Sequence, residues 1–229
     1  MAPHALHIHP TAALAERVLL PGDPGRALAL AQVLLAEPKM FNHNRGLWGY
    51  TGEAADGALL TIQSTGMGGP SAAIVVEELC DLGLRRAVRI GTCGALNGRL
   101  ALGDVVAARE VIPADGTSRA LGAGERLRPD PGLQAVLEAH ADHAGPVVST
   151  DLFYDPRAEL PGQWLAAGAL AVEMEAATVL AVAARRGVRA ACLLVVSDTQ
   201  AGGGERIAAD RLAEASERVG RAALAALEA

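Results

Sequence analysis

Residues 59–82, with the sequence LLTIQSTGMGGPSAAIVVEELCDL, decide the fold class of this chain. Residues 59–63 form a short, mostly apolar run, which predicts a buried β-strand. The glycine-rich stretch 66–69 predicts a turn. Pro70 then opens a helix that we expect to continue to about Leu82, because proline is tolerated at the first helical position. A strand, a tight turn and a helix in this order indicate a βα unit.

The same pattern recurs along the chain. Residues 17–20 predict a strand, which a turn at 21–24 joins to a helix from about Gly25 to Leu35. Further strands are predicted at 87–90, 104–108, 147–149 and 190–196, and further helices at 173–186 and near the C-terminus. We therefore expect an α/β fold in which one domain, residues 1–229, has a central mixed, mostly buried β-sheet flanked by helices.

The composition and charge of the chain exclude several classes of function. The chain has 229 residues, 51% of them hydrophobic, and a net charge of −6, which is unfavourable for binding a nucleic acid backbone. Its apolar runs are too short for a membrane helix, and histidines stand where a signal peptide would be apolar. The three cysteines are odd in number and widely spaced, so we expect reduced thiols. These features predict a cytoplasmic protein that binds neither nucleic acid nor membrane.

Three small-residue turns follow predicted strands, at residues 22–24, 66–70 and 91–94. The carboxyl ends of strands are where open α/β sheets bind ligands, and exposed turn amides suit an anion. Alternatively, the glycines only allow the chain to turn. The middle turn has Ser71 where a dinucleotide-binding loop needs glycine, and no phosphate-loop motif is present.

Arginines near these turns strengthen the anion-site interpretation. Arg26 follows the first turn, Arg45 lies in an Asn-Arg-Gly sequence, and Arg89 lies inside an apolar strand. A buried arginine is costly unless it meets an anion or a carboxylate, so Arg89 holds either a phosphate-like ligand or a structural salt bridge.

Acidic residues form the second feature. Glu173 and Glu175 stand where a strand meets a helix, and Ser197-Asp198 comes directly after the hydrophobic run 190–196, at the carboxyl end of that strand. Each acid also has a purely structural alternative: Glu173 and Glu175 could be a charge pair at a helix N-terminus, and Asp198 could be an N-cap. The sequence offers no catalytic triad, and its crowded N-terminal histidines do not resemble a zinc site.

Seven motifs together resemble one family. In order they are PGDPGR (21–26), STGMGGPS (64–71), VEEL (76–79), RIGTCG (89–94), STDLFY (149–154), VEMEA (172–176) and VSD (196–198). They are similar to motifs of the bacterial hexameric purine nucleoside phosphorylases and uridine phosphorylases, and the resemblance runs from the N-terminus to the last helix. It implies a nucleoside phosphorylase-like fold.

The resemblance also implies site residues. It assigns phosphate binding to Gly22, Arg26, Arg89 and Thr92, together with Arg45 from a neighbouring subunit.

For the nucleoside, the resemblance implies that Glu175 binds the ribose 2′- and 3′-hydroxyls, with Met174 packed under the sugar and Glu173 beside it. Phe153 would lie against the base.

Asp198 would donate a proton to purine N7. The assisting arginine of the family falls, without any gap, at Arg211, thirteen positions later, with Arg206 as the second choice. An ordinary aspartate is ionised at neutral pH, so we expect Asp198 to be partly desolvated or to share a proton with its surroundings.

An N-terminal histidine of this family reaches the neighbouring subunit's ribose. Pro3-His4 looks most like the family's start, and His7 is the fallback. A site that borrows residues from a neighbour implies a homo-oligomer, and the resemblance implies a homohexamer built as a trimer of dimers.

The expected function is reversible phosphorolysis of purine ribo- or deoxyribonucleosides, in nucleoside salvage, with inorganic phosphate as co-substrate and no metal or organic cofactor. Uridine phosphorylase is the nearest alternative, but residues 153–158 lack that branch's Gly-Gln-x-Arg motif. A phosphate-independent nucleosidase and a non-catalytic nucleoside-binding protein also remain. The sequence leaves open whether a purine base carries a 6-oxo or a 6-amino group.

Overall fold

The computed structural model describes residues 5–199 and 204–228. His4 and the stretch 200–203 therefore lie outside the described residues.

Within residues 5–199, nine strands form one mixed sheet, in the order β2-β3-β4-β1-β5-β8-β7-β6-β9. The strands are β1 (Arg17–Pro21), β2 (Ala36–Asn42), β3 (Gly49–Glu53), β4 (Leu59–Gln63), β5 (Arg86–Ala95), β6 (Val105–Pro113), β7 (His143–Ser149), β8 (Ala171–Glu173) and β9 (Arg189–Thr199). β4, β1, β5 and β9 run parallel to their neighbours in that group, whereas β3 and β8 are antiparallel to β4 and β5.

Half of the sheet closes on itself. β5 pairs with both β8 and β9, and β9 pairs with β6, so β5, β8, β7, β6 and β9 form a continuous ring of strands. β1, β4, β3 and β2 extend from β5 as an open wing. β5 is therefore the shared strand of both halves, which places its residues at the centre of the molecule.

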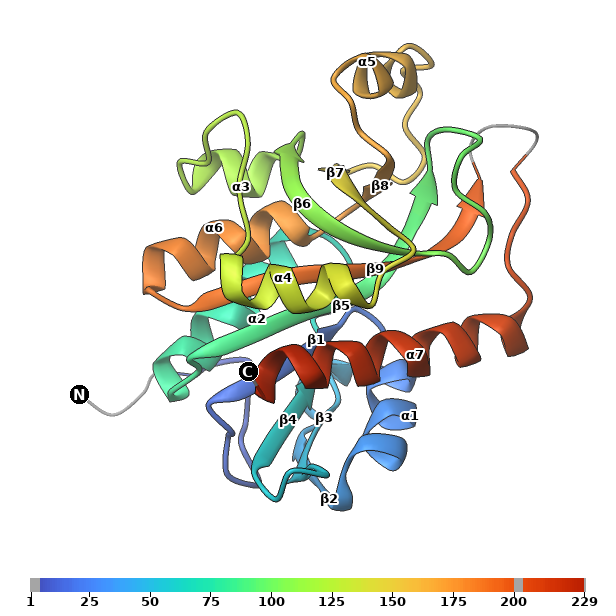
Figure 1. The fold of residues 1–229 in the computed structure, drawn as a ribbon. Helices are drawn as coiled ribbons and strands as arrows, with labels where there is room; N and C mark the ends of the chain where they lie inside the picture. The colour runs from blue at the N-terminus through green and yellow to red at the C-terminus, as the bar shows by residue number, and fades with distance from the viewer. Residues whose placement is uncertain (1–4, 200–203, 229) are drawn as a thin grey trace.

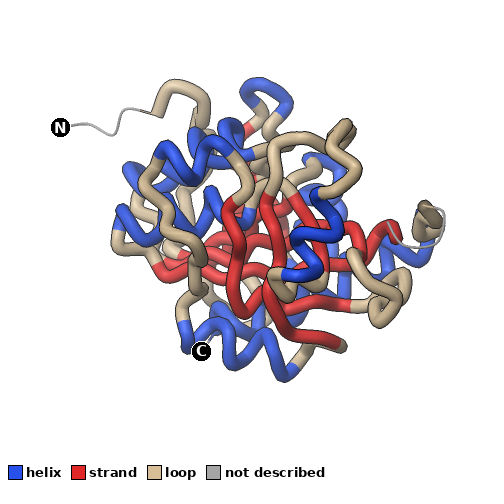
Figure 2. The backbone as a smooth tube through the Cα atoms, turned by 90° about the horizontal axis from the view of Figure 1, so that it is seen from above, coloured by secondary structure: helices blue, strands red, loops and turns tan. Residues whose placement is uncertain are grey.

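Helices cover the sheet on both faces. They are α1 (Pro24–Leu34), α2 (Gly69–Leu82), α3 (Gly116–Ala120), α4 (Pro131–Ala139), α5 (Leu160–Ala166), α6 (Ala176–Arg186) and α7 (Ala209–Glu228), with a short 3-10 turn η1 (Asn44–Gly46). Figure 1 shows α4 and α7 side by side in front of the strands, and α7 also packs on α1. α2 and α6 pack against each other and against β1. Figure 2 shows the strands in the middle of the molecule and the helices mainly around them.

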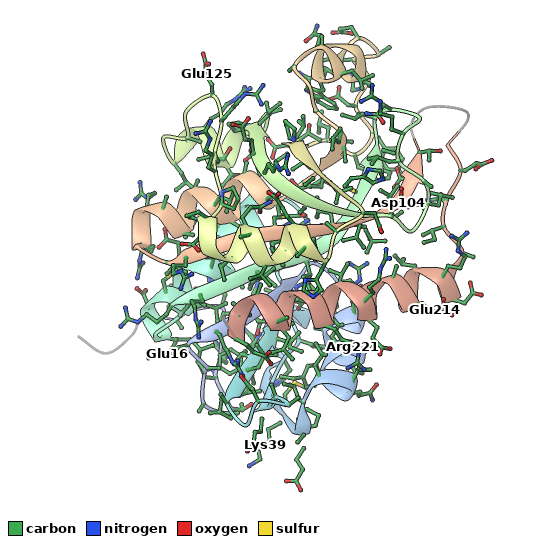
Figure 3. All side chains as sticks on the ribbon, in the orientation of Figure 1. Glu16, Lys39, Asp104, Glu125, Glu214 and Arg221 are labelled. Atoms are coloured by element: carbon green, nitrogen blue, oxygen red, sulfur yellow. The ribbon has the colours of Figure 1, made fainter. Side chains whose placement is uncertain are left out.

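The apolar core follows these layers. Residues of α1, α4 and α7 pack with one face of the sheet around Leu19, Val88 and Leu193, all less than 1% exposed. Residues of α2 and α6 pack with β1 on another face. Most charged side chains lie outside this core, and those of Glu16, Glu125 and Glu214 are exposed at the periphery (Figure 3).

The predicted α/β class is confirmed, and several element bounds agree closely. β4 has the predicted bounds 59–63, and α2 begins one residue before Pro70 and ends at Leu82. α1 runs from Pro24 to Leu34, capped by Asp23, whose carboxylate accepts a hydrogen bond from the Arg26 amide.

Two local predictions are wrong. Residues 91–94 do not form a turn, because β5 continues as a strand through Ala95. The helix predicted from Glu173 begins only at Ala176, and Glu173 is the last residue of β8. In both places the backbone pairs with a neighbouring strand, and that pairing overrides the local signal.

Among the described residues, no helix has the length and apolar character needed to span a membrane.

Candidate active site

A cavity of about 640 Å³ collects most of the residues singled out from the sequence. It is lined by Gly22, Arg26, Arg45, Arg89, Thr92, Phe153, Glu173, Met174, Glu175 and Asp198. Gly22 follows β1, Glu173 ends β8 and Asp198 lies near the end of β9, so different strands deliver these residues to one place. The sheet therefore brings together motifs that are up to about 175 residues apart in the chain.

Arg89 is the buried charge at the base of this cavity. It is 2% exposed. Its Nη2 lies 2.8 Å from Glu173 Oε2 and 2.5 Å from Glu175 Oε2, and its Nε donates to Glu173 Oε2 at 2.9 Å. Burial alone would lower the pKa of Arg89, but the two carboxylates outweigh burial and raise it. The structural salt bridge proposed from the sequence is therefore present.

The Arg89 guanidinium is nevertheless not saturated. Its Nη1 is buried and has no hydrogen-bond partner among the described residues. An unpaired donor on a buried cation is costly, and within the described part of the chain this nitrogen still lacks an acceptor.

Gly91 makes room for this arginine. A Cβ atom at position 91 would lie 2.8 Å from Arg89 Nη2, closer than real Cβ contacts allow. The glycine of the RIGTCG motif thus serves side-chain packing within a strand, and does not form the turn expected from the sequence.

Glu175 lies between the strand β8 and the helix α6. Its Oε1 accepts a hydrogen bond from the Gly68 amide at 2.5 Å, and its Oε2 faces Arg89. Gly68 has a φ of 87°, a backbone conformation that favours glycine. Burial raises the pKa of Glu175, while Arg89 opposes this rise and Glu173 adds to it.

Asp198 is positioned by an irregularity in the sheet. Cys93 pairs with Val196 but Gly94 pairs with Asp198, so Ser197 is an extra residue in β9. Such a bulge redirects neighbouring side chains. The Ser197 hydroxyl donates to Asp198 Oδ2 at 2.9 Å, and a Cβ at Gly94 would lie 2.8 Å from Asp198 Oδ1.

The other two arginines lie at the cavity as well. Burial lowers the pKa of Arg26, Asp23 raises it, and the nearby charge of Arg89 lowers it further.

Arg45 is exposed and has a φ of 57°. The Leu47 carbonyl next to its turn accepts hydrogen bonds from Asn42 Nδ2 and Gln63 Nε2, which fixes the chain there.

Not every predicted residue lies at the cavity. Arg211 donates from Nη2 to the Leu102 carbonyl at 3.1 Å and is not among the lining residues, whereas Arg206, the second choice, is. His7, the fallback for a residue that serves a neighbouring subunit, does not line the cavity of its own chain, and its Nδ1 lies 2.6 Å from Glu78 Oε1 on α2.

The cavity also contains residues that the sequence did not single out. Trp164 of α5 lines it and belongs to the same apolar cluster as Val172, and Asp155 and Arg157 form a pair with an N–O distance of 2.6 Å at the cavity. α5 stands apart from the other helices at the top of Figure 1. Nothing in the local sequence indicated that this helix would face the motifs.

Charged residues of both signs line the cavity. Arg26, Arg45 and Arg89 all line the cavity, Glu175 supplies a buried carboxylate that pairs with Arg89, and Asp198 is a further acid on the same cavity. An anion, a polyhydroxylated group and a leaving group that accepts a proton fit such a series. Among the described residues, no group of three or more His, Cys, Asp or Glu side chains is arranged to hold a metal ion.

This chain is similar to known proteins over most of its length. A family model described as the phosphorylase superfamily matches residues 16–228. A guanosine phosphorylase from Halorubrum lacusprofundi is 39% identical over 198 residues, which cover 83% of this chain and 81% of that protein. A purine nucleoside phosphorylase of the DeoD type from Jannaschia sp. is 41% identical over 196 residues, covering 81% and 82%. One from Alkaliphilus metalliredigens is 35% identical over 207 residues, covering 86% and 88%.

Proposed function

The chain belongs to the phosphorylase superfamily, and on this basis we propose that it catalyses the reversible phosphorolysis of purine nucleosides to the free base and ribose 1-phosphate. It is a nucleoside phosphorylase, a pentosyltransferase, and relatives named for purine nucleosides and for guanosine support the purine substrate. The proposal treats residues 1–229 as one functional domain.

The observation that supports phosphate as co-substrate is the unpaired Nη1 of buried Arg89, on a cavity that Arg26 and Arg45 also line. A phosphate dianion would supply the missing acceptor and would meet the positive charges of Arg26 and Arg45, whereas Glu173 and Glu175 already balance the charge of Arg89. Gly22 and Thr92, on the same cavity, would complete this end of the site. Phosphate bound there would attack C1′ of the ribose.

Glu175 would accept hydrogen bonds from the ribose hydroxyls, with Met174 beside the sugar and Phe153 against the base. Phe153 is 56% exposed, so a base that stacks on it would cover apolar surface. Cleavage of the glycosidic bond builds positive charge on the sugar and negative charge on the leaving purine. Asp198 would neutralise the latter by protonating N7, assisted by Arg211 or Arg206.

The proposed reaction needs no metal or organic cofactor. Bound phosphate stabilises the positive charge on the sugar, and the protein's own acid serves the leaving group.

The first prediction tests phosphate dependence. We expect inosine, guanosine or adenosine to be cleaved only when inorganic phosphate is present, because three arginines line the cavity. The measurement is release of free base and of ribose 1-phosphate with and without phosphate. Equal cleavage rates in both conditions would identify a nucleosidase instead. Faster cleavage of uridine than of any purine nucleoside would assign the chain to the pyrimidine branch, and absence of cleavage would leave a binding protein.

We further propose a homo-oligomer, a hexamer assembled as a trimer of dimers, in which Arg45 and His4 serve the site of a neighbouring subunit. Arg45 also lines the cavity of its own chain, but it is exposed and lies on the short turn η1, from which it can reach a second molecule.

The second prediction separates these two uses of Arg45. A chain carrying Arg45→Ala and a chain carrying Asp198→Asn should each be weakly active. After mixing and reassembly they should regain activity, because some sites would combine an intact Asp198 with a neighbour's intact Arg45. Activity that stays at the average of the two variants would mean that Arg45 acts within its own chain. Sedimentation of the mixture verifies that mixed assemblies form.

We place this activity in the salvage of nucleosides in the cytoplasm, where phosphate and free nucleosides are both present.

A further inference from the structure

Glu173 is the most completely bonded charged side chain in the cavity. It is 1% exposed. Its Oε2 accepts hydrogen bonds from Arg89 Nε and from the backbone amides of Glu175 and Ala176, all at 2.9 Å. Its Oε1 accepts from the Ala176 amide at 3.0 Å and from the Ser149 hydroxyl.

These donors occupy the acceptor capacity of a carboxylate, which has about four lone-pair directions. A substrate hydroxyl could therefore bind Glu173 only by displacing a protein donor. Glu175 differs, because its described partners are only the Gly68 amide and Arg89. The two acids of the VEMEA motif thus have separate tasks: Glu175 faces the ligand, and Glu173 holds the residues around it.

Ser149 is the least expected member of this network. It ends β7, is fully buried, and reaches Glu173 from a strand other than the one that carries that acid. Its Oγ also accepts a hydrogen bond from the Ala177 amide at 2.8 Å. Ala177 belongs to the first turn of α6, whose amides have no partner within the helix. One hydroxyl therefore ties together β7, the end of β8 and the start of α6.

We propose that Ser149 is a positioning residue for the phosphate and ribose sites. Its hydroxyl fixes the Glu173 carboxylate, which in turn sets the direction of the Arg89 guanidinium and of the backbone at Glu175. Ser149 itself does not line the cavity, so it acts through these two residues. This inference rests on the proposed function, since it assigns the alignment of the same site.

Glu173 acts on Arg89 in two ways: it balances the charge of the guanidinium, and it fixes the direction in which the guanidinium points. Loss of the Ser149 hydroxyl affects only the second. Without the Ser149 hydroxyl, Glu173 still balances the charge of Arg89. It can, however, rotate, because the constraint on Oε1 falls from two donors to the Ala176 amide alone. Displacements of about 1 Å in a site that positions its reactants can cost on the order of 100-fold in rate. Loss of supporting contacts behind a binding group costs about 10–100-fold in affinity in metal sites.

The test compares Ser149→Ala with Ser118→Ala. Ser118 is also fully buried, and its hydroxyl also donates to a carboxylate, that of Asp115, but neither residue lines the cavity. Each of the two substitutions therefore removes a buried hydroxyl that donates to a carboxylate, and they differ in whether that carboxylate lines the cavity. Both variants should lose similar thermal stability. Only Ser149→Ala should raise the KM for phosphate, by on the order of tenfold, with a smaller change in kcat.

Binding of inorganic phosphate to the free protein, measured by calorimetry, gives a readout that does not depend on nucleoside cleavage. Ser149→Ala should weaken it by the same factor, and Ser149→Thr, which keeps the hydroxyl, should restore most of it. If Ser149→Ala does not fold, Ser149→Cys replaces it, because a thiol fills the space but is a weak donor.

The outcomes are distinct. Phosphate binding in Ser149→Ala equal to that in Ser118→Ala overturns the positioning role. A parent protein that binds phosphate but does not cleave nucleosides overturns the proposed function while the comparison of phosphate binding still decides the role of Ser149. A parent protein that binds no phosphate overturns both.

Discussion

Asp198→Asn is expected to lower kcat/KM for inosine by a factor on the order of 10²–10⁴, the range that general acid catalysis usually contributes. Asparagine has nearly the size and shape of aspartate and can still donate a hydrogen bond, but it has no acidic proton for purine N7. The Ser197 hydroxyl now donates to Asp198 Oδ2 and can equally meet an amide oxygen, so the bulge in β9 should persist. The measurement is steady-state phosphorolysis at saturating phosphate.

The leaving group provides the decisive comparison for Asp198. The base of 7-methylguanosine already carries a positive charge, so it needs no proton when it leaves. Asp198→Asn should cleave it nearly as fast as the parent does. Asp81→Asn is a suitable control, because it removes a carboxylate that pairs with Arg186 away from the cavity. Equal losses on inosine and 7-methylguanosine would make Asp198 a structural residue and would contradict the proposed acid.

Arg89→Ala is expected to have the second large effect, raising the KM for phosphate well over tenfold and lowering the free energy of unfolding by about 3–5 kcal/mol. Both effects have one cause. Arg89 lies between Glu173 and Glu175, and its removal leaves these buried carboxylates without their cation while it deletes Nη1, the nitrogen proposed to bind phosphate. An exposed ion pair would contribute only about 0–1 kcal/mol. Phosphate kinetics and denaturant unfolding measure the two effects separately.

A second variant keeps the test informative if Arg89→Ala unfolds. Gly91→Ala retains the arginine, but its Cβ would lie 2.8 Å from Arg89 Nη2 and must displace the guanidinium. We expect it to raise the KM for phosphate with a smaller loss of stability. Gly124→Ala is the matched control, because no heavy atom lies within 4 Å of its new Cβ. An unchanged KM for phosphate in folded variants at 89 and 91 would reduce Arg89 to a structural ion pair.

The fold class could be predicted because its signal is local. The run at 59–63, the glycines that follow it and Pro70 each act through nearest neighbours in the chain, and β4 and α2 form almost as predicted. β2, with five exposed residues in its seven, has no apolar run that would reveal it. It exists because it pairs with β3, which is a long-range contact.

Most of the site residues predicted from the sequence do line the cavity, because the motifs give residue types in a fixed order. Their contacts could not be predicted. The glycines 91 and 94 suggested a turn, yet they are strand residues that leave room for the side chains of Arg89 and Asp198. The sequence favoured Arg211 over Arg206, whereas Arg206 lines the cavity.

The sequence by itself thus determined the alternation of strands and helices, the set of charged residues available for chemistry and the family, because each depends on residue type and order. The tertiary structure decided which charges meet. Arg89 could have held a ligand or a salt bridge, and the fold places it against two carboxylates while it leaves one nitrogen unpaired. It also connects Ser149 to Glu173, since the hydrogen bond between them exists only because β7 and β8 pair side by side. Such pairings depend on distances between segments far apart in the chain, which no local pattern of residues contains.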